Sequence, residues 1–264
     1  KSSQNLNLLL DSYVFIDDNL FELEEVKNSL PAVETFQFDY QNISKSINLL
    51  DSIDSLKTWE TTKEDGKKTN LYKQENKRKL LKDSGIDYNK YLQSLNISIN
   101  IYRNSIKDAD RVSQLINKTN QFNLTTKRYS EKEVESFEKD PSYFTLQVRL
   151  LDKFGDNGMI CVVICKPVNE DIWVIDTWLM SCRVLKRRVE EATLSQIVES
   201  ARRNNVKTIH GIYAPTSKNN MVKDLYGSLG FKFIETTTNS EVWELSVSDY
   251  QERDLPLRVE RKHQ

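Results

Sequence analysis

Three successive apolar runs constrain the fold of this chain most strongly. They cover residues 144–152, 158–166 and 171–180 and are rich in Val, Ile, Leu and aromatic side chains. The segments between them, "KFGDNG" and "PVNED", contain the Gly, Pro, Asn and Asp residues typical of hairpin turns. The sequence therefore predicts an antiparallel meander of three strands.

The segments around this meander predict the rest of a mixed domain. A strand is predicted before it over 96–103, followed by a helix over 108–118. After the meander the pattern predicts helix, strand, helix, strand, strand, over 188–204, 206–214, 219–230, 231–236 and 242–247. We expect one α+β domain over residues 96–264, with helices on the faces of a sheet.

The N-terminal part has a different pattern. Residues 6–37 read as helix, strand, helix, strand, which predicts an α/β layer over residues 1–42. Because the earlier strands of such a sheet are missing, we expect the chain to be the C-terminal portion of a longer protein. Residues 43–95 are highly charged and helical in period, and we expect a solvated helical linker there.

Composition excludes several classes of function. Lys plus Arg number 38 and Asp plus Glu 39, so net charge gives no reason to expect a nucleic-acid or membrane partner. Three cysteines without a secretory leader indicate thiols in a reducing cytoplasm, and no apolar run reaches membrane-spanning length. Two histidines are too few for a zinc cluster or a Ser-His-Asp triad.

Two adjacent carboxylates, Asp17 and Asp18, end a short apolar strand in "VFIDDN". Ligands bind at the carboxyl ends of strands in α/β sheets, and hard oxygen donors there suit Mg²⁺. The alternative is a strand-end turn in which an Asp caps the next helix.

The segment "NKTNQFNLTTKRY", residues 117–129, is dense in amides and hydroxyls. Such groups can bind a polyol or a phosphate through many hydrogen bonds, which makes Lys118, Asn120, Gln121 and Asn123 candidate substrate contacts. The alternative is a polar loop after a helix. In "DKFGDNG", Asp156 is a candidate general acid or base, although hairpin geometry alone explains this turn.

The segment "APTSKNNMVKDLYGSLGF", residues 214–231, resembles the last conserved segment of GNAT-type acyltransferases. In that family an Asn contacts the pantetheine arm, and a Tyr often protonates the leaving thiolate. The resemblance assigns these roles to Asn219 or Asn220 and to Tyr226, with Thr216 and Lys218 as neighbouring substrate contacts. A helix stop with a packed tyrosine is the alternative.

The stretch "SCRVLKRRVE", residues 181–190, places one cysteine before four basic residues. Cys182 lies near a predicted helix N-terminus and beside Arg183, and both features favour a thiolate of lowered pKa. The alternative is a structural cysteine. In acyltransferases of the GNAT type a glycine-bearing loop holds the coenzyme A pyrophosphate here. Lys186 and Arg188 occupy the glycine positions, which predicts that the backbone does not approach a pyrophosphate closely.

Taken together, these five motifs resemble those of FkbH-like proteins, over nearly all of the chain. Members join a domain of the haloacid dehalogenase superfamily to an acyltransferase-like domain. The resemblance implies that Lys1 faces the phosphate and that Asp17 and Asp18 bind magnesium. It also implies that Cys182 is the acyl-bearing nucleophile and that Arg183 lies near the phosphate.

Family members take the glyceryl group of 1,3-bisphosphoglycerate, hold it as a thioester and pass it to the phosphopantetheine thiol of an acyl carrier protein. We therefore expect a cytoplasmic transferase that acts on a small phosphorylated three-carbon substrate, with an acyl carrier protein as partner. One alternative is an acyl-CoA-dependent N-acyltransferase that uses Tyr226. Another is a non-catalytic module whose basic cluster docks an acidic carrier surface.

Overall fold

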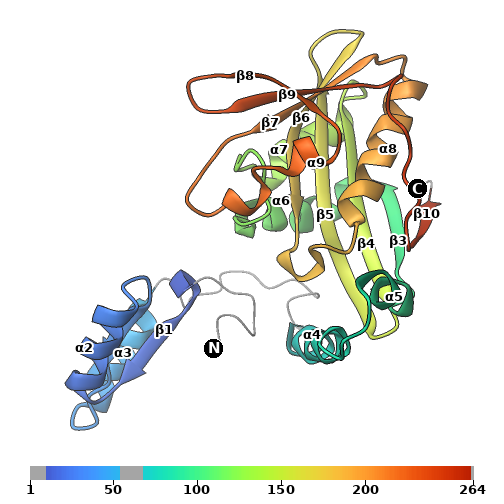
Figure 1. Cartoon of the computed structure of the whole chain (residues 1–264). Coiled ribbons are helices and arrows are strands. Elements are labelled where there is room, and N and C mark those ends of the chain that lie inside the picture. Colours follow the sequence, from blue (N-terminus) through green and yellow to red (C-terminus); the bar gives the residue numbers. More distant parts are fainter. Residues whose placement is uncertain (1–9, 54–67, 263–264) are drawn as a thin grey trace. The chain divides into compact units, whose positions relative to one another are not determined.

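The computed structural model describes residues 10–53 and 68–262 (Figure 1). The chain divides into two compact units, Lys1–Tyr72 and Lys73–Gln264. This division falls inside the segment that was expected to be a linker, and helix α4 (Lys68–Lys82) crosses it.

The first unit is a small α/β layer. Its elements are η1 (Leu10–Ser12), β1 (Val14–Asp17), α2 (Leu20–Ser29), β2 (Glu34–Gln37) and α3 (Ile43–Ser52). Strands β1 and β2 are parallel, with Val14 opposite Glu34, and α2 forms the crossover between them. Helix α2 begins where the Asn19 side chain accepts a hydrogen bond from the Phe21 N–H. The α/β character predicted for this part is confirmed.

An eight-stranded mixed sheet forms the centre of the second unit. Its strand order is β10-β3-β4-β5-β6-β7-β9-β8, and the predicted meander β4-β5-β6 is antiparallel. Within this sheet, only β10–β3 and β6–β7 are parallel among the described pairs. The strands are β3 (Ser98–Arg103), β4 (Phe144–Asp152), β5 (Gly155–Pro167), β6 (Ile172–Met180), β7 (Thr208–Tyr213), β8 (Lys232–Thr236), β9 (Glu241–Ser246) and β10 (Arg258–Lys262).

Helices cover both faces of this sheet (Figure 1). One face carries α8 and α9, and the other carries α6 and α7. Their bounds, with the remaining helical elements, are α5 (Tyr88–Ser94), η4 (Ile106–Asp108), α6 (Ala109–Lys118), α7 (Glu131–Lys139), η5 (Cys182–Val184), α8 (Val189–Arg203), η6 (Asn220–Val222) and α9 (Leu225–Ser228). The predicted α+β architecture is confirmed for this part of the chain.

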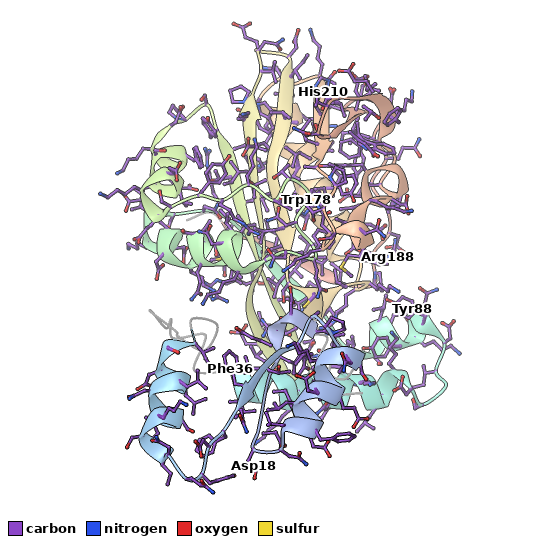
Figure 2. All side chains as sticks on the ribbon, turned by 90° about the vertical axis from the view of Figure 1, so that its left-hand side faces the viewer. Asp18, Phe36, Tyr88, Trp178, Arg188 and His210 are labelled. Atoms are coloured by element: carbon purple, nitrogen blue, oxygen red, sulfur yellow. The ribbon has the colours of Figure 1, made fainter. Side chains whose placement is uncertain are left out.

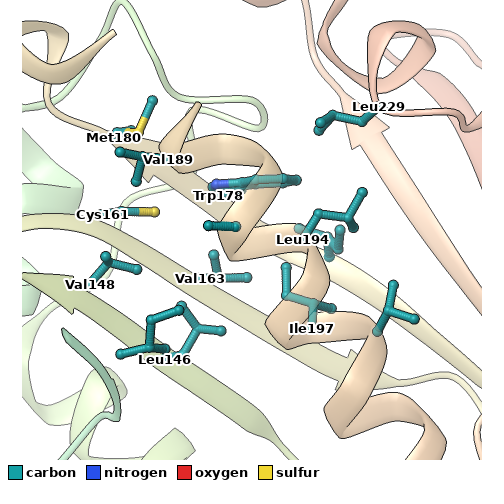
Figure 3. Packing of buried hydrophobic residues seen from close by; sticks show 14 of the residues in the cluster. Leu146, Val148, Cys161, Val163, Trp178, Met180, Val189, Leu194, Ile197 and Leu229 are labelled. Carbon is teal, nitrogen blue, oxygen red and sulfur yellow. The ribbon is translucent and has the colours of Figure 1, made fainter. Parts of the chain in front are cut away.

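The larger hydrophobic core lies between the sheet and α8. Figure 3 shows Leu194 and Ile197 of α8 beside Val163 of β5, with Trp178 of β6 close to them. All four side chains are at most 1% exposed. Burying a side chain of this size stabilises the fold by roughly 1.5–3 kcal/mol, so this contact is a main source of the unit's stability.

Three elements differ from the sequence-based expectation. Helix α7 was not predicted, although Ser130 and Glu133 form a capping box at its start. The helix expected over 219–230 is divided into η6 and the short α9, with Gly227 inside α9, where glycine weakens a helix. Strand β10 was not predicted, because "RVERK" lacks the alternating apolar pattern of a half-buried strand. In the fold it lies at the edge of the sheet and pairs with β3.

The expected solvated linker is also only partly right. From Lys73 onward, α4 belongs to the second unit, and its Arg78 side chain is 1% exposed. Arg78 donates to both carboxylate oxygens of Asp152, at 2.7 Å each. One side of α4 is therefore anchored to the β4–β5 hairpin rather than surrounded by water.

Candidate functional site

The parallel strands β6 and β7 separate part-way along their length. They pair from Ile172 with Thr208 to Ile175 with Gly211, and the rest of β6 has no partner on that side from β7. Ligands of α/β sheets bind in crevices at the carboxyl ends of strands. The opening between β6 and β7 is therefore the expected place for a binding site.

A segment of the chain's own backbone fills the opening. We call residues 122–126 the insert segment. The Leu124 N–H donates to the Trp178 carbonyl at 3.1 Å, and the Met180 N–H donates to the Phe122 carbonyl at 3.0 Å. On the other side, the Ala214 N–H donates to the Leu124 carbonyl at 2.8 Å. The insert segment thus bridges β6 and the end of β7 as a short additional strand.

Side chains on both sides hold the insert segment in place. The buried Asn219 amide donates to the Asn123 carbonyl at 2.9 Å, and the Thr125 hydroxyl donates to the Asp176 carbonyl at 2.8 Å. Thr126 has a φ of 53°, a left-handed conformation unusual for a β-branched residue, and its N–H donates to the Asn123 side chain. These contacts make the insert segment an integral part of the sheet.

Asp176, an acid within the apolar strand β6, anchors the continuation of the insert segment. Its carboxylate lies 2.5 Å from Lys127 Nζ and 3.2 Å from Lys166 Nζ, and accepts the Tyr129 hydroxyl at 2.7 Å. Burial opposes ionisation, but the hydrogen bonds from Lys127 and Tyr129, together with the lysine charges, hold the pKa of Asp176 below its ordinary value. Asp176 is therefore an ionised anchor at neutral pH.

Cys182 lies just beyond the end of β6, in η5. Its side chain is partly exposed, whereas Cys161 and Cys165 are fully buried in the core. Burial raises the pKa of the Cys182 thiol, and the Arg183 charge offsets only part of this effect. The expectation of a lowered pKa is wrong because η5, not α8, begins at this residue, and desolvation outweighs the neighbouring cation.

The basic cluster of residues 183–188 is largely neutralised within the fold. Arg187 is 4% exposed and binds Glu75 at 2.9 Å and Asp152 at 3.2 Å. Arg188 forms two hydrogen bonds with Glu191, at 2.8 and 2.9 Å. Two of the four cations that were expected to dock an acidic surface are therefore already paired with acids inside the protein.

The loop backbone keeps a glycine-type conformation without glycine. Lys186 has a φ of 62° and Arg188 a φ of 61°. For residues with a side chain this left-handed conformation costs roughly 1–2 kcal/mol each. Lys186 and Arg188 therefore have the backbone conformation that glycines would adopt in this loop. Their Cβ atoms and side chains still occupy space beside the loop backbone.

Tyr226 is a core residue in this structure. Its side chain is fully buried, its ring centroid lies 6.2 Å from that of Trp178 and 4.8 Å from that of Phe231, and burial raises its pKa well above the ordinary value. A Cβ added to Gly211 would lie 2.4 Å from this ring, so β7 needs glycine here. The structure contradicts the expected acid role, because the hydroxyl has no exposure to solvent or substrate.

Other expected site residues have local structural partners. Asn219 accepts from the Thr216 N–H at 2.7 Å, so its own polar atoms are used inside the protein, contrary to the expected arm contact. Asn123 is fully buried and donates to the Thr119 carbonyl at 3.2 Å, so it cannot contact a substrate as expected. Asp156 is exposed and accepts from the Gly158 N–H at 2.7 Å within its turn.

The remaining candidates lie at the surface. Asn120 accepts a hydrogen bond from Arg128, and Gln121 is half-buried. Lys118 ends α6 in an exposed position, and Lys218 is exposed beside the buried Asn219. The structure thus brings Asn123 and Asn219 together directly, but as structural partners.

The expected magnesium ligands lie in the first unit. Asp17 accepts the Asn19 N–H at 2.9 Å in a strand-end turn, but α2 is capped by Asn19 and not by an Asp, and Asp18 is exposed. No group of three or more His, Cys, Asp or Glu side chains that could hold a metal is present in residues 10–53 and 68–262. The two carboxylates supply few of the six oxygens that Mg²⁺ needs, so the described residues do not fit a complete site. Lys1 lies outside the described residues.

Comparisons with known proteins identify only distant structural neighbours. No family model matches the chain, and no curated protein matches it. The GNAT domain of S. lividans PAT has 16% identity and a TM-score of 0.45, over 55% of this chain and 89% of that chain. The ribosomal-protein-S18-alanine N-acetyltransferase from Escherichia coli has 17% identity and a TM-score of 0.44, over 58% and 97%.

A third neighbour is yncA, a putative acetyltransferase from Salmonella typhimurium solved with its cofactor acetyl-CoA. It has 12% identity and a TM-score of 0.44, over 58% of this chain and 95% of that chain. These comparisons give no support to the expected haloacid-dehalogenase part or to the FkbH-like resemblance. Likeness at this level carries no argument about substrate or mechanism.

Sequence reasoning missed the residues that organise the site. Asp176 had a usable signal, because a lone acid in the apolar strand "WVIDTWL" must find a partner when it is buried. Arg78 had none, since it stands among exposed lysines in a charged helix.

In the described part of the chain no helix is long and apolar enough to cross a bilayer.

Proposed function

We propose that the second unit is an acyl-transfer domain in which the Cys182 thiol carries the acyl group. The observation that supports this most is the position of Cys182. It is the partly exposed cysteine of the three and lies beyond the carboxyl end of β6, past the point where the pairing of β6 with the parallel strand β7 stops. Arg183 follows directly in the chain and brings a cation next to the thiol.

The chemistry has two balanced steps. The Cys182 thiolate attacks the carbonyl carbon of an acyl phosphate, the bond from that carbon to the phosphate oxygen breaks, and phosphate leaves. The sulfur of a phosphopantetheine thiol then attacks the thioester carbonyl carbon, the bond from that carbon to the Cys182 sulfur breaks, and the proton of the attacking thiol passes to the released Cys182 thiolate. Arg183 supports the first step as an electrostatic partner for the departing phosphate.

The raised pKa of Cys182 fits a substrate-dependent mechanism. Because burial raises the pKa of the Cys182 thiol, the thiolate form is disfavoured at neutral pH in the resting protein. Reaction then requires a base for the thiol proton, and an acyl phosphate dianion bound beside Arg183 brings such a base. A small phosphorylated three-carbon acid is the proposed donor, and an acyl carrier protein is the proposed acceptor.

A second candidate function is acyl-CoA-dependent N-acyltransfer. The left-handed loop backbone at Lys186 and Arg188 favours it, because that is the conformation of a phosphate-cradling loop. The insert segment counts against it. An extended pantetheine arm needs free backbone groups in the opening, and the Trp178 carbonyl and the Met180 N–H are already paired there.

An assay of carrier acylation distinguishes the two candidates. The whole chain is incubated with 1,3-bisphosphoglycerate and a phosphopantetheinylated acyl carrier protein, and the carrier mass is followed. The proposal expects the carrier to gain the acyl mass, and Cys182→Ala to abolish this gain. Acyl transfer that persists undiminished in Cys182→Ala, with acetyl-CoA as an effective donor, would support the second candidate instead.

A further inference from the structure

Basic and apolar side chains gather where α4 ends and α5 begins. We call this surface the α4–α5 corner and define it by Lys77, Leu80, Lys82, Ile86, Tyr88 and Lys90. Between residues 73 and 90 there are six Lys or Arg and three Asp or Glu, although the whole chain has a net charge of −1. The corner is thus a local positive region on a nearly neutral chain.

The acids of this region are partly used inside the protein. Glu75 pairs with Arg78 and Arg187, and Asp87 accepts the Asn89 and Lys90 N–H groups as the cap of α5. By contrast, Lys77, Lys82 and Lys90 are exposed and form no ion pair with any residue in the described ranges. Their charges face solvent, and the exposed Asp83 offsets only part of them.

Apolar side chains lie among these lysines. Leu80 is 73% exposed, and Ile86 and Tyr88 are each 40% exposed. Lys73, Lys77 and Leu80 follow helical spacing along the outer side of α4, whereas Arg78 and Leu81 face inward. Exposed apolar side chains rimmed by charge are typical of a surface that binds a protein, since a partner can cover the centre while the rim selects for opposite charge.

The corner is a fixed neighbour of the loop that carries Cys182. The Tyr88 hydroxyl donates to the Lys186 carbonyl, and Arg187 reaches back to Glu75 of α4. Figure 2 shows Tyr88 and Arg188 near each other, at the same end of the sheet. The buried Arg78–Asp152 pair holds α4 on the β4–β5 hairpin. A partner seated on the corner would therefore be held beside the η5 loop.

We propose that the α4–α5 corner docks a small acidic carrier protein, with Leu80 at the centre of the contact and Lys77, Lys82 and Lys90 around it. This inference rests on the proposed function, because it assigns the surface that receives the acceptor. Complementary charge accelerates association and fixes orientation, which a flexible phosphopantetheine arm needs in order to reach one thiol.

The test measures binding and transfer with the whole chain and a holo acyl carrier protein as the probe. Lys77→Glu/Lys82→Glu and Leu80→Asp are each expected to weaken carrier binding by roughly tenfold or more. The matched control Lys107→Glu/Lys132→Glu makes the same charge change at exposed positions of η4 and α7 and is expected to leave binding unchanged. Circular dichroism confirms that each variant is folded.

The outcomes separate this inference from the proposed function. If the corner variants lower carrier acylation but leave acylation of Cys182 by the acyl phosphate at the wild-type rate, both proposals are supported. Equal carrier binding by the corner variants and the control would overturn the docking site, even if Cys182 is acylated. Binding to phosphatidylserine vesicles but not to the carrier would also overturn it. If the corner variants weaken carrier binding but Cys182 is not acylated by the acyl phosphate, the docking site is retained and the proposed function is refuted.

Discussion

The Asn219 side-chain amide donates to the backbone carbonyl of Asn123 at 2.9 Å, across 96 positions of sequence and inside the core. The same amide donates to the Ala214 carbonyl, also at 2.9 Å. Asn219 therefore ties the insert segment to the chain that follows β7. In the GNAT resemblance this residue contacts a pantetheine arm, whereas here it binds the protein segment that fills the opening.

Replacing Asn219 with alanine is expected to lower the free energy of unfolding by about 2–3 kcal/mol, because it leaves buried carbonyls without a donor. The neighbouring Asn220 is exposed, so Asn220→Ala is the matched control and should change stability by less than about 0.5 kcal/mol. Urea denaturation followed by circular dichroism gives both values. Equal stability of the two variants would show that the Asn219 hydrogen bonds do not hold the insert segment.

Arg78→Met is expected to destabilise the protein by roughly 3–5 kcal/mol, because it leaves the fully buried Asp152 without its main partner. Lys77→Met, one position away on the exposed side of α4, is the control and should have a small effect. Hydrogen exchange across residues 73–82 should also become faster in Arg78→Met only. Unchanged exchange there would contradict the anchoring of α4.

Asp176→Asn is expected to lower stability at neutral pH by about 1–3 kcal/mol, through loss of its charged partners. Because the pKa of Asp176 is lower in the folded protein than in the unfolded chain, its contribution is present above its ordinary pKa and is lost as pH falls through the depressed value. Denaturation at a series of pH values should show a shallower acid limb in Asp176→Asn. Parallel acid limbs in the two proteins would contradict the anchor role.

Lys186→Gly is expected to stabilise the protein by about 0.5–1 kcal/mol, since glycine adopts a φ of 62° without strain. Lys77→Gly, within helix α4, should instead lower stability by about 1 kcal/mol. Thermal unfolding of the two variants should therefore shift in opposite directions. A loss of stability in Lys186→Gly would argue against the left-handed loop conformation.

The reactivity of Cys182 should follow its raised pKa. Alkylation by iodoacetamide is expected to be slow at neutral pH and to accelerate through the alkaline range, because only the thiolate reacts. Arg183→Gln should slow it further, since the favourable cation is lost. Cys161 should remain unlabelled in the folded protein, as burial raises its pKa to about 12. Rapid labelling of Cys182 at neutral pH that is insensitive to Arg183→Gln would contradict this account.

The sheet could be predicted from sequence because its strands carry strong local signals. The runs that became β4, β5 and β6 are apolar and bounded by turn residues, so their pairing followed from the turns. Strand β10 could not be predicted, since an edge strand buries little and needs no apolar pattern. The burial of helix α4 was misjudged because one of its inward side chains, Arg78, is charged, and apolar periodicity does not mark a buried arginine.

The site was harder to predict, because its residues act through contacts between distant segments. Cys182 could be found from its local motif, but the direction of its pKa shift depends on burial by the folded chain. The amides of "TNQFN" indicated a ligand site. In the fold, Asn123 instead belongs to the insert segment between β6 and β7, and the separation of these two strands is not visible in the sequence. Polar residues that serve structure and those that serve binding have the same sequence signature.

The proposed acyl-carrying role of Cys182 is tested most directly by locating the acyl group on the protein. The whole chain is incubated with 1,3-bisphosphoglycerate, digested, and its peptides are analysed by mass spectrometry before and after treatment with hydroxylamine, which cleaves thioesters. An acyl adduct is expected on the peptide that contains Cys182, lost after hydroxylamine and absent from Cys182→Ser. An adduct on another residue, or none on Cys182 while the carrier is still acylated, would contradict it.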